Sequence, residues 1–412
     1  FYIQFIFEKT IINLKNIITY KNYLMKYCIE FKIIYFSNYI EYEYRNENMG
    51  KQRPEWAPEN AGEEFASQVK PGIENIENIK KTPAKKWNPE IDDFVSGIID
   101  GNRAILAKAI TFIESNSAKH LQTAQEILRR LLPETGRSIR IGITGSPGAG
   151  KSTFIDTLGT NLCNKDKKVA VLAVDPSSSR SRGSILGDKT RMEDLSRHEN
   201  AFIRPSPSGG ALGGVARKTR ETILLCEAAG FDVILIETVG VGQSEIAVRS
   251  MVDFFLLLLL PGAGDDLQGI KKGSVELADA LVINKADSGN EKRAESTRQS
   301  YEMAIHYILP ATQGWETKVF SCSSTENKGI DNIWNAINQF TEQTKKSGFF
   351  WERRKQQQLE WLHNMIEEEI KHIFYSNPVI KKNLADVEEK LSKETITPTQ
   401  AVQNLIEKFR NI

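Results

Sequence analysis

The chain has 412 residues, of which 40% are hydrophobic and 26% charged, and its formal net charge is +1. This composition is ordinary for a globular protein, and the length allows one large domain with extensions or two domains. The near-neutral charge gives no global field that would attract nucleic acid or an anionic membrane, so we expect neither as a partner.

Residues 1–48 differ in composition from the rest of the chain, since they are crowded with Ile, Tyr, Phe, Asn and Lys and contain no Gly or Pro. They match neither a secretory signal nor a transit peptide. Our hypothesis is that Met49 is the true start and that the preceding segment is upstream translation; a genuine helical or membrane-associated extension is the alternative. Residues 49–135 are expected to form a disordered lead and then an N-terminal helical extension that stops at Pro133.

Residues 136–345 alternate short apolar runs with amphipathic segments, which is typical of parallel strands joined by helical crossovers. We therefore expect an α/β fold, a mainly parallel sheet between two layers of helices, with ligands bound outside the carboxyl ends of the strands. The run Phe254–Leu260 is too short for a membrane span of about 20 residues and is expected to be a strand buried on both faces. The expected strands are Ser138–Thr144, Lys168–Asp175, Phe231–Glu237, Asp253–Leu260, Ala280–Asn284 and Lys318–Ser321.

A phosphate-binding motif follows the first expected strand. The pattern GxxxxGK[ST] opens a helix there, which is the context that a P-loop requires. Backbone N–H groups and the helix N-terminus should bind phosphate oxygens, Lys151 should reach the β- and γ-phosphates, and Ser152 should ligate Mg²⁺. The nucleotide-binding residues expected here are Gly145, Ser146, Pro147, Gly148, Ala149, Gly150, Lys151, Ser152 and Thr153.

A base-reading motif of the form NKxD follows a later strand. The carboxylate of Asp287 can accept hydrogen bonds from guanine N1–H and from the exocyclic amino group, whereas adenine has no donors there. Each hydrogen bond to a charged group contributes about 1.5–3 kcal/mol, so two give roughly 10²- to 10⁴-fold discrimination. The motif thus predicts GTP and GDP as ligands. The residues expected at the base are Asn284, Lys285, Asp287, Ser321, Cys322 and Ser323.

Carboxylates and glycines at other strand ends are candidates for metal and switch positions. Glu237 opens a DxxG-like segment, where it can hold a Mg²⁺-bound water while the N–H of Gly240 responds to the γ-phosphate. Asp175 and Asp188 follow another strand, although a turn or helix-capping role fits their local sequence equally well. The glycine-rich segment 261–272 is expected to be a mobile loop near the site, with a solvated turn as the alternative.

The C-terminal part, residues 346–412, has a helical and charged pattern. One long amphipathic helix is expected over Trp351–Ile370 and a second helical stretch over Val387–Phe409. The apolar stripe of the first helix has no evident use in the α/β domain, so we expect a dimerisation region that forms a homodimer. Packing of the stripe on its own domain is the alternative.

Together these segments resemble the MeaB/ArgK/MMAA family of G proteins, over about residues 90–410. The resemblance implies a P-loop protein of the SIMIBI class and a GTPase that chaperones an adenosylcobalamin-dependent acyl-CoA mutase, usually methylmalonyl-CoA mutase. It implies gated cofactor delivery from an adenosyltransferase, with cobalamin contacted only through the partner, and protection or reactivation of the mutase. The segments that carry it are Gly142–Phe154, Val174–Ser178, Gly183–Met192, Leu212–Glu221, Glu237–Glu245 and Gly264–Gly273.

The same resemblance assigns roles to residues that local sequence leaves open. Asp175, Asp188 and Glu237 are expected to be Mg²⁺-site or catalytic carboxylates beside Ser152. Asp265 and Lys271 are expected in a third switch loop that responds to the mutase. The expected catalytic residues are therefore Lys151, Asp175, Asp188, Glu237 and Lys271.

Three other functions compete with this one. A P-loop kinase, in line with the arginine/ornithine transport kinase label of some family members, would usually need a catalytic base for its acceptor, and none is assignable. A nucleotide sensor without turnover stays open. A nickel-insertion GTPase would need a Cys/His cluster, which the histidines do not form with the scattered cysteines. Those cysteines, Cys28, Cys163, Cys226 and Cys322, contain no CxxC pair and suit a reducing compartment, so we expect a cytoplasmic location.

Overall fold

The computed structural model describes residues 89–115, 117–174, 191–205, 212–238, 243–262 and 272–410. Within these ranges, no helix is both long and apolar enough to cross a membrane. The expected upstream segment lies outside them, as do several expected site residues, namely Asp175, Asp188, Gly240, Asp265 and Lys271.

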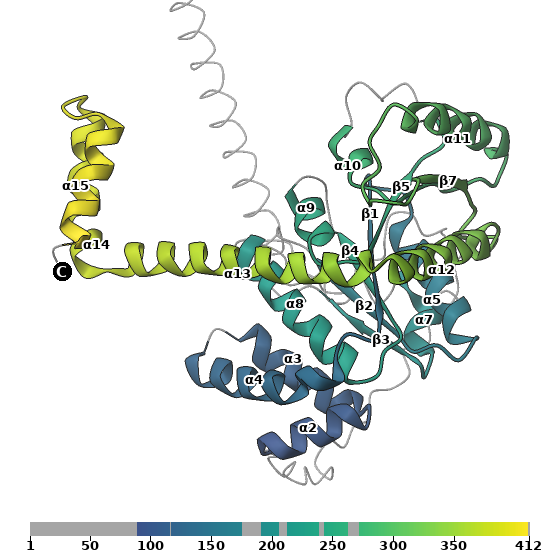
Figure 1. The fold of residues 1–412 in the computed structure, drawn as a ribbon, viewed down its shortest axis with the longest axis horizontal. Helices are drawn as coiled ribbons and strands as arrows, with labels where there is room; N and C mark the ends of the chain where they lie inside the picture. The colour runs from purple at the N-terminus through teal and green to yellow at the C-terminus, as the bar shows by residue number, and fades with distance from the viewer. Residues whose placement is uncertain are drawn as a thin grey trace, which may run out of the picture. The chain divides into compact units, whose positions relative to one another are not determined.

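A seven-stranded sheet with strand order β3-β2-β4-β1-β5-β6-β7 forms the centre of the α/β domain, and all of its strand pairs are parallel (Figure 1). The predicted α/β fold is therefore confirmed. One strand, β3, was not expected from sequence, because it is a four-residue edge strand that is only partly buried. The strands are β1 (Ile139–Gly145), β2 (Val169–Val174), β3 (Ala201–Arg204), β4 (Val233–Thr238), β5 (Phe254–Leu259), β6 (Ala280–Ile283) and β7 (Lys318–Ser321).

The central strands are near-continuous apolar runs because helices cover both faces of the sheet. β5 has the sequence FFLLLL and is buried at every position but the last, as predicted. β1 lies between β4 and β5, and the later strands β5, β6 and β7 extend the sheet on the side away from β2. This change of direction beside β1 is the switch point at which open α/β sheets bind ligands.

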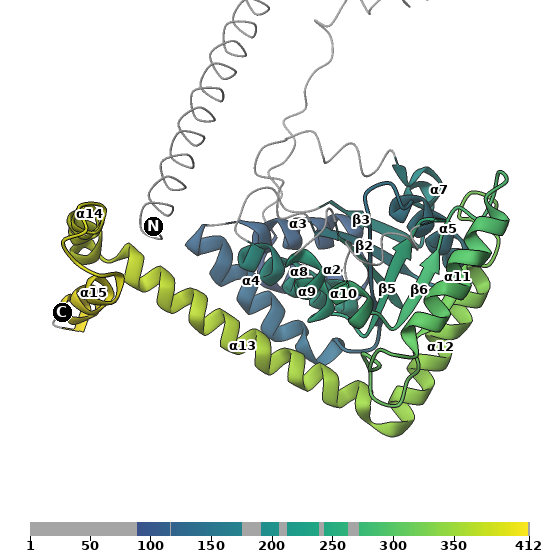
Figure 2. The same ribbon diagram turned by 90° about the horizontal axis from the view of Figure 1, so that it is seen from above.

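Helices lie on both sides of the sheet (Figure 2), and two main hydrophobic clusters fill the space between the sheet and these helices. The helices of the first cluster are α2 (Ile91–Ile99), α3 (Arg103–Glu114), α4 (Ala118–Leu131), α8 (Leu212–Ala228) and α9 (Gln243–Arg249). The helices of the second are α5 (Lys151–Cys163), α7 (Glu193–Arg197) and α12 (Ile330–Ser347). A smaller cluster packs α10 (Lys272–Glu276) and α11 (Glu291–Ile305) against β5, β6 and β7. The N-terminal helices thus share one core with the sheet.

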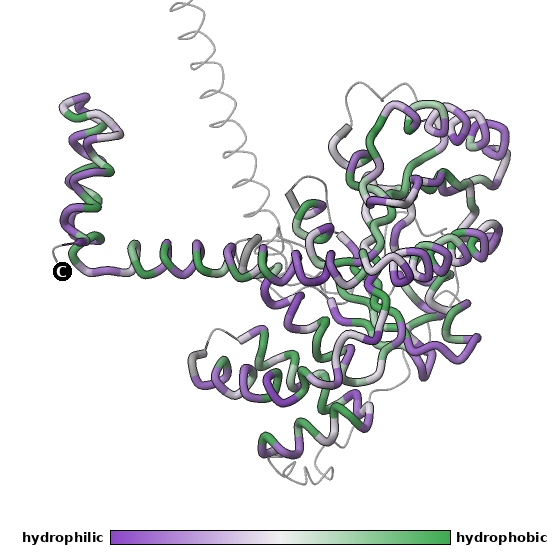
Figure 3. Tube along the Cα trace, in the orientation of Figure 1, coloured by the Kyte–Doolittle hydropathy of each residue, from purple (hydrophilic) through white to green (hydrophobic). Residues whose placement is uncertain are grey.

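Three C-terminal helices follow α12, and Gly348, with φ 82°, separates the first of them from α12. The helix α13 (Phe349–Ser376) buries Phe350, Arg354 and Gln357 in its first turns and exposes apolar side chains further along. Figure 3 shows hydrophobic residues recurring as bands along this helix. The single stretch expected over Val387–Phe409 is instead two helices, α14 (Pro378–Ser392) and α15 (Pro398–Arg410). The chain turns between them, with Glu394 at φ 53°, and their apolar faces pack together.

Candidate nucleotide-binding site

The segment between β1 and α5 contains two glycines at positions that leave no room for a side chain. Gly145 has φ 154°, and a Cβ at this position would lie 2.4 Å from the carbonyl oxygen of Leu258. Gly150 has φ 85° at the N-terminus of α5, and a Cβ there would lie 2.6 Å from Nδ2 of Asn284. Since larger residues fit neither position, the glycines of the P-loop motif are explained by the backbone geometry itself.

The ammonium group of Lys151 lies across this loop. Its Nζ donates to the carbonyl oxygens of Gly145 at 2.9 Å and Ser146 at 3.3 Å. The charge is therefore held at the mouth of the loop, beside the positive end of the α5 dipole. This arrangement attracts a phosphate group and places a flexible cation next to it.

A hydroxyl and a carboxylate meet beside the loop. Ser152 donates through Oγ to Oε1 of Glu237 at 3.1 Å. The carboxylate reaches this position because β4 pairs with β1, with Glu237 opposite Ile143, and its residue is only 6% exposed. Oxygen ligands of this kind suit Mg²⁺, so the two described residues fit the metal expected here.

Asn284 connects the base-reading loop to the P-loop. Its Nδ2 donates to the carbonyl oxygen of Ala149 at 2.9 Å. Its Oδ1 accepts from the backbone N–H and the hydroxyl of Ser324, at 3.2 Å and 2.8 Å. The side chain is buried, and its described contacts are with protein groups, so the Asn of the motif braces three loops against one another.

Two hydroxyl groups position the carboxylate of Asp287. Its Oδ2 accepts hydrogen bonds from the hydroxyls of Ser323 and Thr325, the latter at 3.0 Å. The Ser323 bond is the main reason why the pKa of this partly exposed carboxyl lies below its ordinary value. An ionised carboxylate at this place can accept from the N–H groups of guanine, as the sequence motif predicts.

The segment after β7 packs against the base-reading loop. The N–H of Cys322 donates to the carbonyl oxygen of Ile283, and its carbonyl accepts from the N–H of Ala286, both at 2.9 Å. The N–H of Ser323 donates to Lys328 at 3.0 Å. These two expected base-contacting N–H groups are thus already bonded within the protein. Burial raises the pKa of the Cys322 thiol to about 12, which makes it a packing group and not a nucleophile.

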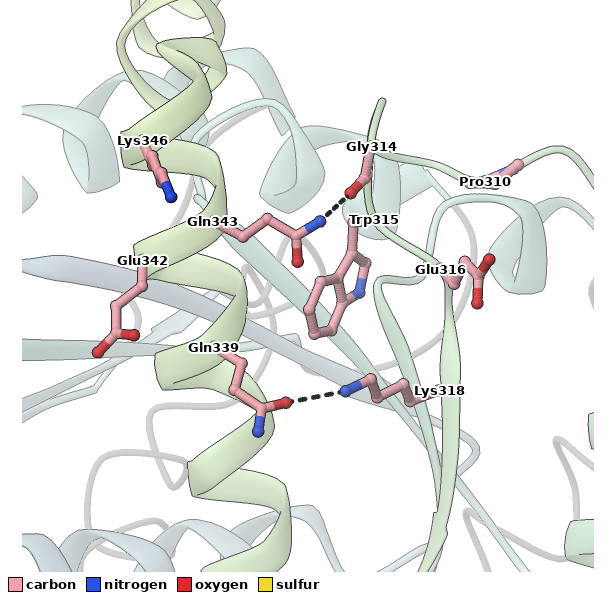
Figure 4. Close-up of a pocket in the computed structure, with 9 residues that line it drawn as sticks. All are labelled: Pro310, Gly314, Trp315, Glu316, Lys318, Gln339, Glu342, Gln343 and Lys346. Atoms are coloured by element: carbon pink, nitrogen blue, oxygen red, sulfur yellow. Dashed lines mark hydrogen bonds between the residues drawn. The ribbon is translucent and has the colours of Figure 1, made fainter.

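A groove of about 740 Å³ lies away from this site, between α12 and the segment that precedes β7 (Figure 4). It is lined by Lys318, which begins β7, whereas the base-binding segment follows the other end of that strand. Lys318 donates to Gln339 at 2.9 Å across the groove, and its ammonium lies 4.8 Å from the ring centroid of Trp315. The groove is therefore at the amino ends of the strands and does not belong to the nucleotide site.

An all-parallel sheet with a P-loop after its central strand, and an NKxD loop braced against that P-loop, defines a P-loop GTPase. Residues 106–379 match the family model described as methylmalonyl Co-A mutase-associated GTPase MeaB. The chain therefore belongs to the MeaB family of GTPases, and it is an enzyme that hydrolyses GTP.

Individual relatives agree with this family. GTPase ArgK of Escherichia coli is 46% identical over 307 residues, which cover 74% of this chain and 93% of the relative. The methylmalonic aciduria type A homolog, mitochondrial, of Mus musculus is 42% identical over 331 residues, which cover 78% of this chain and 80% of the relative. A crystal structure named LAO/AO transport system kinase superposes with TM-score 0.65 and 38% identity, covering 79% of this chain and 99% of that one.

Proposed function

We propose that GTP hydrolysis by this chain gates adenosylcobalamin loading of an acyl-CoA mutase, and protects or reactivates that mutase. Methylmalonyl-CoA mutase is the first candidate, because the matching family model is named for association with it and the mouse relative is named for methylmalonic aciduria. An adenosyltransferase would supply the cofactor, and this chain would contact cobalamin only through its partner. The observation that carries the proposal is that the family match spans both the nucleotide site and α13.

In this proposal, the nucleotide is bound by the P-loop and by the NKxD loop, which the Asn284–Ala149 bond joins. The carboxylate of Asp287 selects guanine, the P-loop N–H groups and Lys151 bind the phosphates, and Asn284 fixes the distance between these two parts. We place Mg²⁺ on Ser152 and Glu237, with Asp175 and Asp188 as its further carboxylates. When bound, the ion would neutralise charge on the β- and γ-phosphate oxygens. Lys271 remains our candidate for a residue that acts when the mutase is engaged.

A homodimer through α13 is part of the proposal. Leu362, Ile366 and Ile370 are 52%, 46% and 59% exposed, and they recur at helical spacing on one side of α13. Apolar rows of this length usually mark an interface, and a symmetric pair is the commonest one. A cytoplasmic location stays a prediction.

The test is cofactor transfer in a reconstituted system of adenosyltransferase, methylmalonyl-CoA mutase and this chain. We expect transfer of adenosylcobalamin to the mutase to proceed with GTP and to stall with a non-hydrolysable GTP analogue. A Lys151→Ala chain should stall in the same way with GTP. Equal transfer rates with both nucleotides, or without the chain, would refute the gating function while leaving the GTPase intact.

The kinase alternative predicts a different product. The solved relative carries a kinase name, but that name describes the relative alone. Radiolabelled γ-phosphate should appear as free phosphate with this chain. Its appearance on arginine, ornithine or a protein would favour the kinase.

A further inference from the structure

Buried hydroxyls and a buried carboxylate form a hydrogen-bonded row beneath the phosphate site. Thr238 donates through Oγ1 to Oγ1 of Thr144 at 2.9 Å, and Thr144 donates to Oε1 of Glu245 at 3.2 Å. The second carboxylate oxygen, Oε2, accepts from the hydroxyl of Ser274. None of the four residues is more than 5% exposed. The row is therefore almost completely buried.

The members of the row come from elements that border the phosphate site. Thr144 directly precedes Gly145 of the P-loop, and Thr238 directly follows Glu237, the candidate metal ligand. Glu245 lies in the first turn of α9, and Ser274 lies in α10. The Glu245 carboxylate thus bonds both to β1, the strand that leads into the P-loop, and to α10. No hydrogen bond named above joins α10 directly to a described residue of the phosphate site.

The Ser274–Glu245 bond is one of the tertiary contacts that hold α10 in place. α10 has only five residues, which is too short to be stable as an isolated helix, so tertiary contacts must hold it in place. Val275 supplies an apolar contact, and the Ser274 hydroxyl supplies a hydrogen bond to a charged acceptor. Hydrogen bonds to a carboxylate in a dry site are among the strong ones. A displacement of the Glu245 carboxylate should therefore displace α10.

We propose that Glu245 is a positioning residue that makes the state of α10 depend on the nucleotide in the phosphate site. Binding or loss of the γ-phosphate acts on the ends of β1 and β4, which carry Thr144 and Thr238. The row transmits that change to the Glu245 carboxylate, and Ser274 transmits it to α10. The inference rests on the proposed GTP-gated function, and it supplies an internal route by which the nucleotide state would reach α10.

Amide hydrogen exchange tests the route in the full chain, with GDP or a non-hydrolysable GTP analogue bound and no mutase present. In the wild type, peptides covering α9 and α10 should both exchange at different rates in the two states. In a Ser274→Ala chain, the difference should vanish in α10 and persist in α9, since only the last bond of the row is lost. Ser274→Thr keeps a hydroxyl and should restore the difference in α10.

Ser138→Ala is the matched control. Ser138 is also a buried serine that donates to a buried carboxylate, Oε1 of Glu227 at 2.7 Å, but it lies at the amino end of β1. This variant should keep the nucleotide-dependent difference in α10. If Ser274→Ala does not fold, Ser274→Cys replaces the hydroxyl by a weaker donor and should reduce the difference.

Two results would overturn the proposal: no nucleotide-dependent exchange in α10 of the wild type, or the same dependence in wild type and Ser274→Ala. Because the experiment contains no mutase, these results are distinct from failure of the cofactor-transfer assay. A chain that does not gate cofactor transfer can still show nucleotide-dependent exchange in α10. A chain that gates transfer can likewise lack that exchange difference.

Discussion

Asn284 and Ala149 are joined by a hydrogen bond of 2.9 Å from the side-chain amide to the backbone carbonyl, and this bond links the loop proposed to read the base to the P-loop, which is proposed to bind the phosphates. A guanine nucleotide must contact both loops at once. The bond therefore constrains the distance between the two loops, and such a constraint reduces the ordering cost of binding.

Asn284→Ala should weaken both the fold and nucleotide binding. The substitution leaves the Ala149 carbonyl and the Ser324 N–H buried without this partner, and each buried unsatisfied group costs about 1–3 kcal/mol. We expect GDP affinity in calorimetry to fall at least about tenfold, equivalent to about 1.4 kcal/mol. Asn161→Ala is the control, because Asn161 makes an exposed amide pair with Asn327 and should change neither quantity. Unchanged GDP affinity in Asn284→Ala would show that the brace is dispensable.

Asp287→Asn should change the preferred base. We expect the carboxylate to accept from the N–H groups of guanine, whereas an amide would direct a donor at a donor. The loss of two charge-assisted hydrogen bonds should lower GTP affinity by roughly 10²- to 10⁴-fold. Xanthosine triphosphate, which offers an oxygen in place of the amino group, should then bind better than GTP. Competition binding with both nucleotides measures the change, and an Asp287→Asn chain that still prefers GTP would remove this residue from the base site.

Ser323→Ala should raise the pH at which GDP binding is lost on acidification. The Ser323 hydroxyl is the main cause of the lowered Asp287 pKa, so the ionised carboxylate persists at pH values below the ordinary range near 3.9. A carboxylate with a lowered pKa contributes fully to binding and stability at pH values above its ordinary pKa. This contribution is lost as the pH falls through the lowered pKa. Without the Ser323 hydroxyl, the fall in GDP affinity at acid pH should begin at a higher pH. Thr325→Ala should move it less, because Thr325 contributes less to the shift. The measurement is GDP affinity as a function of pH. The prediction would be contradicted if the wild type, Ser323→Ala and Thr325→Ala all lost affinity over the same acid pH range.

The sequence indicated the sheet, the P-loop and the NKxD loop because each leaves a strong local signal. A run such as FFLLLL admits few alternatives, and the glycines at 145 and 150 are required by the backbone. The bracing role of Asn284 and the row through Glu245 gave no such signal, since both depend on contacts between segments far apart in the sequence. The short strand β3 and the division between α14 and α15 were missed for a related reason: few residues define each of them.

The exposed face of α13 should carry the dimer. Phe350, Arg354 and Gln357 are buried against the α/β domain, and Arg354 pairs with Asp253 at 2.6 Å. A chain that ends at Gly348 would therefore uncover part of the core and leave a buried charge unpaired, which is strongly destabilising. Replacing exposed residues in the full chain is the cleaner experiment.

Leu362→Ser and Ile366→Ser together should turn a dimer into a monomer in light scattering, with the thermal midpoint of the α/β domain unchanged. Both side chains are about half exposed, so their loss removes apolar surface from an interface and not from the core. Glu368→Ser and Lys371→Ser together are the matched control on the same helix, with exposed polar side chains, and should keep the dimer. A dimer that survives the first pair of substitutions would place the interface elsewhere.

Glu237→Gln should raise the Mg²⁺ concentration needed for GTP hydrolysis. The side chain lies 3.1 Å from the Ser152 hydroxyl, and exchanging a carboxylate for an amide keeps the size but removes a charge next to the proposed ion and replaces one acceptor oxygen by a donor. Loss of a metal-supporting group typically costs about 10- to 100-fold in metal affinity or activity, so we expect half-maximal turnover to require at least about tenfold more Mg²⁺. GDP binding in EDTA should be nearly unchanged, since the base loop and the P-loop N–H groups are intact. Phosphate release against Mg²⁺ concentration gives the first quantity and calorimetry in EDTA gives the second. If turnover of the wild type survives EDTA, or if both chains show the same Mg²⁺ dependence, Glu237 does not serve the metal.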